Sequence, residues 1–177
     1  RFDRDVGGRS WFSYPLERLG GVEGNRDHSP GWSRRMDLKP GQILWEVEEA
    51  YQAPVAVDKL TAGPIDYDAV WKSAQRLTDR PVKFGAVSAQ TLPSMLWNEA
   101  YDTDEEMILA LCDIMNAQLK AVAASGCRVI QIEEPLHHFM SLNPDTTDDD
   151  LAFLTEAFNR EVAGVDAEIW VHTCWGN

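Results

Sequence analysis

The stretch RVIQIEEP, residues 128–135, is the clearest predictor of the fold. Apolar and polar side chains alternate along it until a proline ends the run, which is the pattern of a strand with one face against a core. Gln131 and Glu133 share one face of this predicted strand, and Ile130 and Ile132 share the other. We expect the isoleucines to face covering helices, so that the Glu133 carboxylate points to the opposite side at the strand's carboxyl end.

Helical patterns flank this strand on both sides. Residues 103–106, TDEE, have the form of a capping box and predict the start of a long helix that ends at 125–126. Residues 145–150 predict the start of a second helix. An apolar strand is predicted before the first helix, at 81–87, and a buried strand after the second, at 167–171. The order strand, helix, strand, helix, strand is that of βαβ units on a parallel sheet.

Upstream, the pattern continues with a strand at 54–60 and a helix opened by Asp66. This helix would present one apolar stripe, formed by Ala69, Val70, Ala74 and Leu77. A short strand is also predicted at 43–47, whereas the Gly- and Arg-rich residues before it show no periodicity.

Together these elements predict an α/β fold, a (β/α)8 TIM-type barrel of which this chain covers about the middle half, roughly strands 3 to 6. The whole chain, 1–177, would be one partial barrel domain, with an irregular loop region at 1–42 and βα units at 43–177. An open, doubly wound sheet also places its ligand at the carboxyl ends of the strands, so the pattern leaves barrel closure open. The chain begins with Arg and ends within a chemical motif, so we expect a fragment of a larger domain.

The composition excludes some classes of function. A net charge of −13 and a pI near 4.6 argue against nucleic acid or an anionic membrane as a partner. No apolar stretch approaches the roughly 18 residues that a membrane helix needs. Three cysteines in 177 residues do not form a disulfide framework, which favours a reducing, cytoplasmic setting.

A candidate metal pair lies at the end of the last predicted strand. His172 and Cys174 are two residues apart, so they share a face and bring an imidazole and a thiolate together. These groups form half of a tetrahedral zinc site. The alternative is an uncharged core histidine beside a small, apolar cysteine.

Other polar residues gather at or near the same edge of the predicted sheet. Glu133 could bind an ammonium group or act as an acid or base, or form a solvated pair with Glu134, and Glu134 could instead anchor a loop. Ser88 follows the strand at 81–87, and Lys83 on that strand could neutralise a carboxylate or contact an anionic substrate. His137 and His138 lie in the predicted loop after Pro135, where a substrate-shaping or plain surface role is expected.

Two motifs in this order, VIQIEEP at 129–135 and VHTCWGN at 171–177, resemble the cobalamin-independent methionine synthase family. Its shorter relatives include the epoxyalkane:coenzyme M transferases, and the resemblance runs from about residue 81 to residue 177. It implies a (β/α)8 barrel whose zinc ion is held by a His-x-Cys pair and by a Glu and a Cys from later strands. His172 and Cys174 would then be zinc ligands, with the other two beyond Asn177.

The resemblance also implies a function. The protein would be a cytoplasmic, zinc-dependent methyltransferase of methionine biosynthesis, similar to 5-methyltetrahydropteroyltriglutamate–homocysteine S-methyltransferase. Its partners would be a small-molecule thiol and an alkyl donor. Glu133, at the position of an Asp that contacts the homocysteine amino group, would bind substrate, and we assign the same role to Glu134, Ser88 and Lys83.

The chain departs from the methionine synthases at defined positions. Glu133 replaces the family's Asp, residues 85–88 read GAVS in place of Gly-Pro-Val-Thr, and Leu92 stands where those enzymes place a folate-stacking Trp. Three alternatives therefore stay open: a zinc-dependent epoxide:thiol (coenzyme M) transferase, a metal-free barrel like uroporphyrinogen decarboxylase, and a half barrel without enzymatic activity. Nothing in the sequence predicts the oligomeric state.

Overall fold

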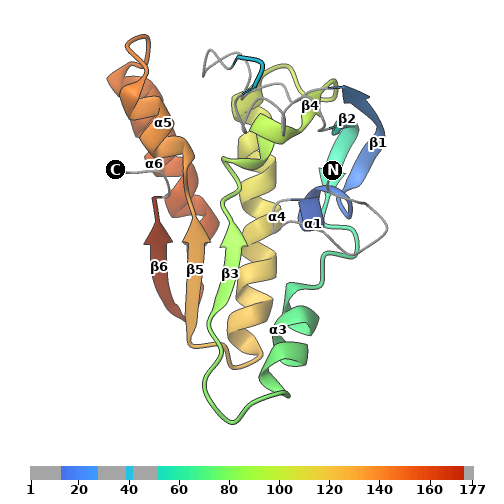
Figure 1. The fold of residues 1–177 in the computed structure, drawn as a ribbon, viewed down its shortest axis with the longest axis vertical. Coiled ribbons are helices and arrows are strands. Elements are labelled where there is room, and N and C mark those ends of the chain that lie inside the picture. Colours follow the sequence, from blue (N-terminus) through green and yellow to red (C-terminus); the bar gives the residue numbers. More distant parts are fainter. Residues whose placement is uncertain (1–12, 28–38, 42–51, 174–177) are drawn as a thin grey trace.

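The computed structural model describes residues 13–27, 39–41 and 52–173 (Figure 1). In chain order the elements are α1 (Ser13–Leu16), β1 (Gly20–Asp27), β2 (Gln52–Thr61), α3 (Tyr67–Gln75), β3 (Phe84–Val87), η2 (Leu92–Met95), β4 (Trp97–Asn98), α4 (Asp104–Ala124), β5 (Val129–Glu133), α5 (Leu136–Leu142), α6 (Asp148–Val162) and β6 (Glu168–His172).

The central feature is a parallel sheet in the order β3-β5-β6. Its register pairs Val87 with Glu133 and Glu133 with His172, so all three strands end at the same edge. α4 connects β3 to β5, and α6 lies between β5 and β6 in the chain; the three arrows run the same way beside α4 (Figure 1). The strands predicted around 81–87, 128–134 and 167–171 and the two helices between them are thereby confirmed.

A second sheet has the order β1-β2-β4 and holds the strand predicted at 54–60. That strand, β2, pairs antiparallel with β1 and parallel with β4. Its predicted place in the parallel sheet is therefore wrong, and the described parallel sheet has three strands instead of four. The strands of the described residues do not close a barrel, and the predicted strand at 43–47 lies outside them.

Part of the region expected to be irregular forms β1. The register between β1 and β2 shifts at Gly21, whose φ is +83°. A Cβ atom there would lie 2.6 Å from the Lys59 carbonyl oxygen, so only glycine permits this bulge. The segment is a strand because it pairs with residues 25 to 41 positions later in the chain. Local periodicity cannot indicate a pairing over that separation.

The helix predicted from Asp66 exists as α3, but the predicted apolar stripe is not the face that the helix buries. Val70 is 42% exposed, and Leu77 is 87% exposed and lies beyond the helix end. The buried side chains are Tyr67 and Trp71. The Trp71 indole donates to the Val82 carbonyl oxygen at 2.9 Å, and these two large rings, having the most apolar area to bury, set the rotation of the helix.

α4 is the central core helix of the described chain. The Thr103 hydroxyl accepts from the Glu106 N–H at 3.2 Å at its start, as the predicted cap requires. Its buried side chains are Met107, Ile108, Leu111, Cys112, Met115, Leu119 and Val122. By length and composition α4 could also cross a membrane, so the expectation that no stretch reaches this length is wrong. Its position between α3, α6 and the sheets is that of a core helix.

The last strand, β6, is present, but it is not buried as predicted. Trp170 is 46% exposed and Val171 is 49% exposed. β6 pairs only with β5 among the described strands, and β5 is the one described element with which it makes extensive contact. β6 is therefore an edge strand, which explains this exposure.

Candidate active site

Glu133 and His172 end neighbouring strands and lie on the same face of the parallel sheet. Their register pairs them directly, and 3.7 Å separates Glu133 Oε2 from His172 Nε2. The side chains are 23% and 51% exposed, respectively. Ile130 and Ile132 are fully buried on the opposite face, which confirms the predicted division of this strand. A carboxylate and an imidazole therefore meet at the carboxyl edge.

Lys83 lies at the other end of the sheet, just before β3, and reaches this edge only through Gln131. The Lys83 ammonium donates to Gln131 Oε1 at 2.5 Å. Gln131 Nε2 donates in turn to Glu133 Oε1 at 2.5 Å. The Lys83 nitrogen also lies 4.7 Å from the centroid of a Trp170 ring. Sequence reasoning placed Gln131 on the Glu133 face but assigned it no role.

Glu134 points away from Glu133, into the protein, and is fully buried. Its Oε1 accepts from the Leu136 N–H at 2.9 Å, and its Oε2 accepts from Gln90 Nε2. The Glu134 N–H donates to the His172 carbonyl oxygen at 2.8 Å. This geometry matches the loop-anchoring alternative, and a direct contact between Glu134 and substrate stays a prediction.

Ser88 lies at the carboxyl edge, as predicted, but it is fully buried. Its N–H donates to the Glu133 carbonyl oxygen at 3.0 Å. Its hydroxyl donates to Thr91 Oγ1 at 2.9 Å. Ser88 therefore extends the sheet by one backbone bond and closes the following turn, while its predicted substrate contact remains a prediction.

Glu161 is a buried carboxyl that sequence reasoning missed. It comes from α6, is fully buried, and its Oε2 accepts from the Ala89 N–H at 3.0 Å. Burial raises the pKa of this carboxyl to about 8. The hydrogen bond from the Ala89 N–H lowers the pKa, and the negative charge of Glu134 raises it further. The helical spacing of Glu161 could have indicated its burial, because Leu154, Ala157 and Glu161 lie on one buried face of α6.

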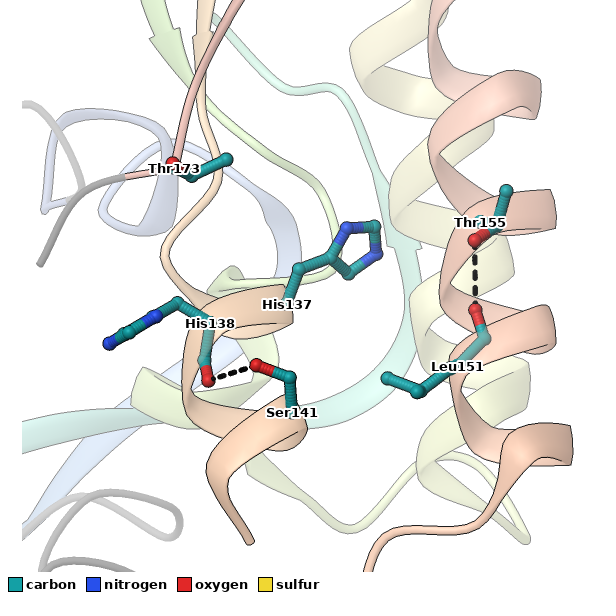
Figure 2. A pocket seen from close by; sticks show the side chains of 6 residues that line it. All are labelled: His137, His138, Ser141, Leu151, Thr155 and Thr173. Atoms are coloured by element: carbon teal, nitrogen blue, oxygen red, sulfur yellow. Dashed lines mark hydrogen bonds between the residues drawn. The ribbon is translucent and has the colours of Figure 1, made fainter. Parts of the chain in front are cut away.

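The two tandem histidines begin a helix, α5, and not a loop as predicted. An open hollow of about 410 Å³ lies beside them, lined by His137, His138, Ser141, Leu151, Thr155 and Thr173. Figure 2 shows His137 on the side toward α6 and His138 pointing away from it. His137 Nε2 lies 3.4 Å from Gln90 Nε2. A substrate-shaping or surface role remains a prediction for both residues.

The predicted zinc pair is only half described, because Cys174 lies outside the described residues. Within the described part of the chain, no three His, Cys, Asp or Glu side chains are placed to hold a metal ion. Cys112 is no candidate ligand, since its thiol donates to the Ala157 carbonyl oxygen and burial raises its pKa to about 12. A zinc site here would need Cys174 and groups beyond those described.

The fold and the site define a class: an α/β protein of TIM-barrel type, with its ionisable groups at the carboxyl edge of a parallel sheet. The chain belongs to the family of the cobalamin-independent synthase catalytic domain, whose family model matches residues 33–177. This match confirms the family that the two motifs indicated.

Two curated relatives are similar in sequence. A methionine synthase from Saccharolobus solfataricus is 28% identical over 147 residues, which are 82% of this chain and 38% of the relative. A methionine synthase from Thermoplasma acidophilum is 31% identical over 135 residues, which are 72% of this chain and 37% of the relative. The chain thus spans less than half the length of these relatives.

One solved structure has a similar fold. It is a B12-independent methionine synthase from Shewanella sp. W3-18-1 in complex with selenomethionine, with a TM-score of 0.67 and 20% sequence identity. The alignment covers 91% of this chain and 42% of that one. Most of this chain therefore shares the α/β architecture of that enzyme.

Proposed function

We propose that the protein is a zinc-dependent alkyltransferase that moves a methyl group to a thiol, with homocysteine as a candidate acceptor. Family membership and two methionine synthase relatives support methyl transfer. The single observation that carries the proposal is the Glu133–His172 pair, 3.7 Å apart at the carboxyl edge. A cytoplasmic location and a completed eight-stranded barrel belong to the same proposal.

His172 and Cys174 have the chemistry of zinc ligands, and they would form part of a set that includes further ligands. His172 would supply an imidazole nitrogen and Cys174 a sulfur, both of which zinc prefers. Histidine ligands usually have a carboxylate or carbonyl partner that orients the ring. Glu133 is the carboxylate beside His172, with Oε2 at 3.7 Å from Nε2, which is longer than a hydrogen bond. When bound, zinc lowers the pKa of a coordinated thiol so that the reactive thiolate is present at neutral pH.

The protein's own side chains would orient the substrate. Glu133 uses Oε1 to accept from Gln131, and Oε2, which faces His172 at 3.7 Å, would also be the oxygen that accepts from a cationic group such as a substrate ammonium. Glu134 and Ser88 hold the two loops that border this point. In the transfer, the thiolate sulfur forms a bond to the alkyl carbon, and the donor departs with the electron pair of the broken bond.

Epoxide opening by coenzyme M is the second candidate, because Leu92 replaces the aromatic residue expected for folate stacking. Leu92 is fully buried in η2, so this position offers no ring surface to a pterin. The same thiolate attack on carbon would open an epoxide, with the ring oxygen taking the electron pair and then a proton. The metal-free decarboxylase-like alternative requires neither His172 nor Cys174.

Zinc content and product analysis of the natural full-length protein test these proposals. We expect about one zinc ion per protein chain. The zinc should be lost in His172→Ala and retained in the matched control His138→Ala, because the His138 ring points away from α6 (Figure 2). A methylated thiol from homocysteine and a methyl donor would support the first proposal. A hydroxyalkyl thioether from coenzyme M and an epoxide would support the second. Unchanged zinc content in His172→Ala would contradict the proposed ligand set.

A further inference from the structure

A line of polar side chains crosses the face of the parallel sheet that carries Gln131 and Glu133, from the amino end of the sheet to its carboxyl edge. The register places Gly85, Gln131 and Trp170 at one level, and Glu133 and His172 one step further along. Lys83 precedes Gly85 by two residues and lies on the same face. A Cβ at Gly85 would meet nothing within 4 Å, so no side chain of β3 separates Lys83 from Gln131.

The hydrogen bonds along this line have a fixed direction. An ammonium group only donates, so Lys83 requires the carbonyl oxygen of the Gln131 side chain as acceptor. With Oε1 turned to Lys83 at 2.5 Å, the amide must present its NH2 group to Glu133, and it does so at 2.5 Å. The opposite amide orientation would set N–H groups against an ammonium.

The orientation of Gln131 in turn decides how Glu133 faces the edge. Glu133 Oε1 is occupied by the amide, and Oε2 is the oxygen that lies 3.7 Å from His172 Nε2. Lys83 is itself held by the Trp170 ring of β6, at 4.7 Å from the ring centroid. Lys83 is therefore held by groups on β5 and β6, and Glu133 is held by Gln131 on its own strand and faces His172 across 3.7 Å.

We propose that Lys83 and Gln131 are positioning residues that act through Glu133 to hold the His172 imidazole in its ligand orientation. This inference rests on the proposed function, because it takes His172 to be a metal ligand. It also changes the expected role of Lys83, which acts on the carboxylate from the far end of the sheet instead of contacting the substrate. Removing the carboxylate or carbonyl partner of a metal-bound histidine typically weakens metal binding by about 10- to 100-fold.

Zinc affinity, measured by competition with a chelator in the natural full-length protein, tests the proposal. We expect Gln131→Met to weaken zinc binding about tenfold. Lys83→Met should weaken it by a similar or smaller factor, and Lys83→Arg should restore most of the loss, since guanidinium also only donates. The matched control is Lys72→Met, which removes an exposed lysine paired with Asp68 on α3.

The double variant Lys83→Met/Gln131→Met shows whether Lys83 acts through Gln131, which we call the relay, or whether the two residues act independently. If Lys83 acts only through Gln131, the double variant binds zinc as weakly as Gln131→Met alone. If the loss of zinc affinity in the double variant equals the product of the two single losses, Lys83 does not act through Gln131 and the proposal is wrong. Unfolding midpoints are measured alongside; if Gln131→Met does not fold, the exposed position Lys83 still provides the test through its Met and Arg variants.

Failure of the relay and failure of the proposed function give different results. If His172→Ala abolishes zinc binding while the Lys83 and Gln131 variants bind zinc normally, the relay is wrong and the proposed function stands. If His172→Ala binds zinc as the natural protein does, the proposed function and the relay both fall.

Discussion

Replacing Glu161 by glutamine should stabilise the protein at neutral pH. The Glu161 carboxyl is fully buried, and its Oε2 accepts from the Ala89 N–H at 3.0 Å. A glutamine side chain has the same shape and keeps a carbonyl oxygen for that hydrogen bond, but it cannot ionise. Glu161 Oε1 has no hydrogen-bond partner among the described residues, so the glutamine NH2 group would be unpaired there, as the hydroxyl of the protonated acid is. The two proteins therefore differ mainly in the cost of ionising a buried group.

The magnitude follows from the pKa. Burial raises the pKa of Glu161 from 4.5 to about 8. Between these values the unfolded chain releases the proton and the folded protein keeps it, so stability falls by about 1.4 kcal/mol for each pH unit. At pH 7 the accumulated cost is about 3 kcal/mol, and it levels off above pH 8. Below pH 4.5 both states are protonated and the cost disappears.

Chemical denaturation of the natural protein and of Glu161→Gln at pH 5, 6, 7 and 8 measures this effect. The stability difference between the two should grow with pH by about 1.4 kcal/mol per unit. Glu156→Gln, at an exposed position on the same helix, is the matched control and should show no such growth. A Glu161→Gln variant whose stability difference is the same at all four pH values would refute the reasoning.

Three further substitutions test the packing and the local structure by denaturation. Trp71→Ala should lower the free energy of unfolding by about 3–5 kcal/mol, because it empties a core position and removes the indole hydrogen bond to the Val82 carbonyl oxygen. A loss of stability below about 1 kcal/mol would contradict the role of Trp71 in setting the rotation of α3. Thr147→Ala should cost about 1 kcal/mol, since the Thr147 hydroxyl and the Asp150 side chain form a capping box at the start of α6. Gly21→Ala should cost more than about 1 kcal/mol, because φ is +83° and the Lys59 carbonyl oxygen lies 2.6 Å from the added Cβ; a neutral effect would show that the bulge is not required.

The elements predicted correctly are those that local sequence determines. The alternation in β5, the cap at Thr103 and the helical spacing of α6 act within a few residues, so they can be recognised without knowledge of the fold. The pairing of β2 with β1 is not local, and nothing within residues 54–60 indicates an antiparallel partner. For this reason the sequence predicts the strand but not the sheet to which β2 belongs.

The candidate site was predictable in outline only. The period of two residues in a strand places Glu133 and His172 on definite faces, and the parallel order brings their strand ends together. The contacts that organise them come from elsewhere: Gln131 needs Lys83 from the segment before β3, and the burial of Glu161 needs the turn at Ala89. Such contacts require the register of the sheet and the rotation of the helix, neither of which a single sequence specifies.

The zinc site is tested most directly by an anomalous-scattering map of the natural full-length protein, recorded on both sides of the zinc absorption edge. The account predicts one peak at about 2.0–2.3 Å from a His172 ring nitrogen and the Cys174 sulfur. A map from zinc-replete crystals with no peak beside His172 would contradict it.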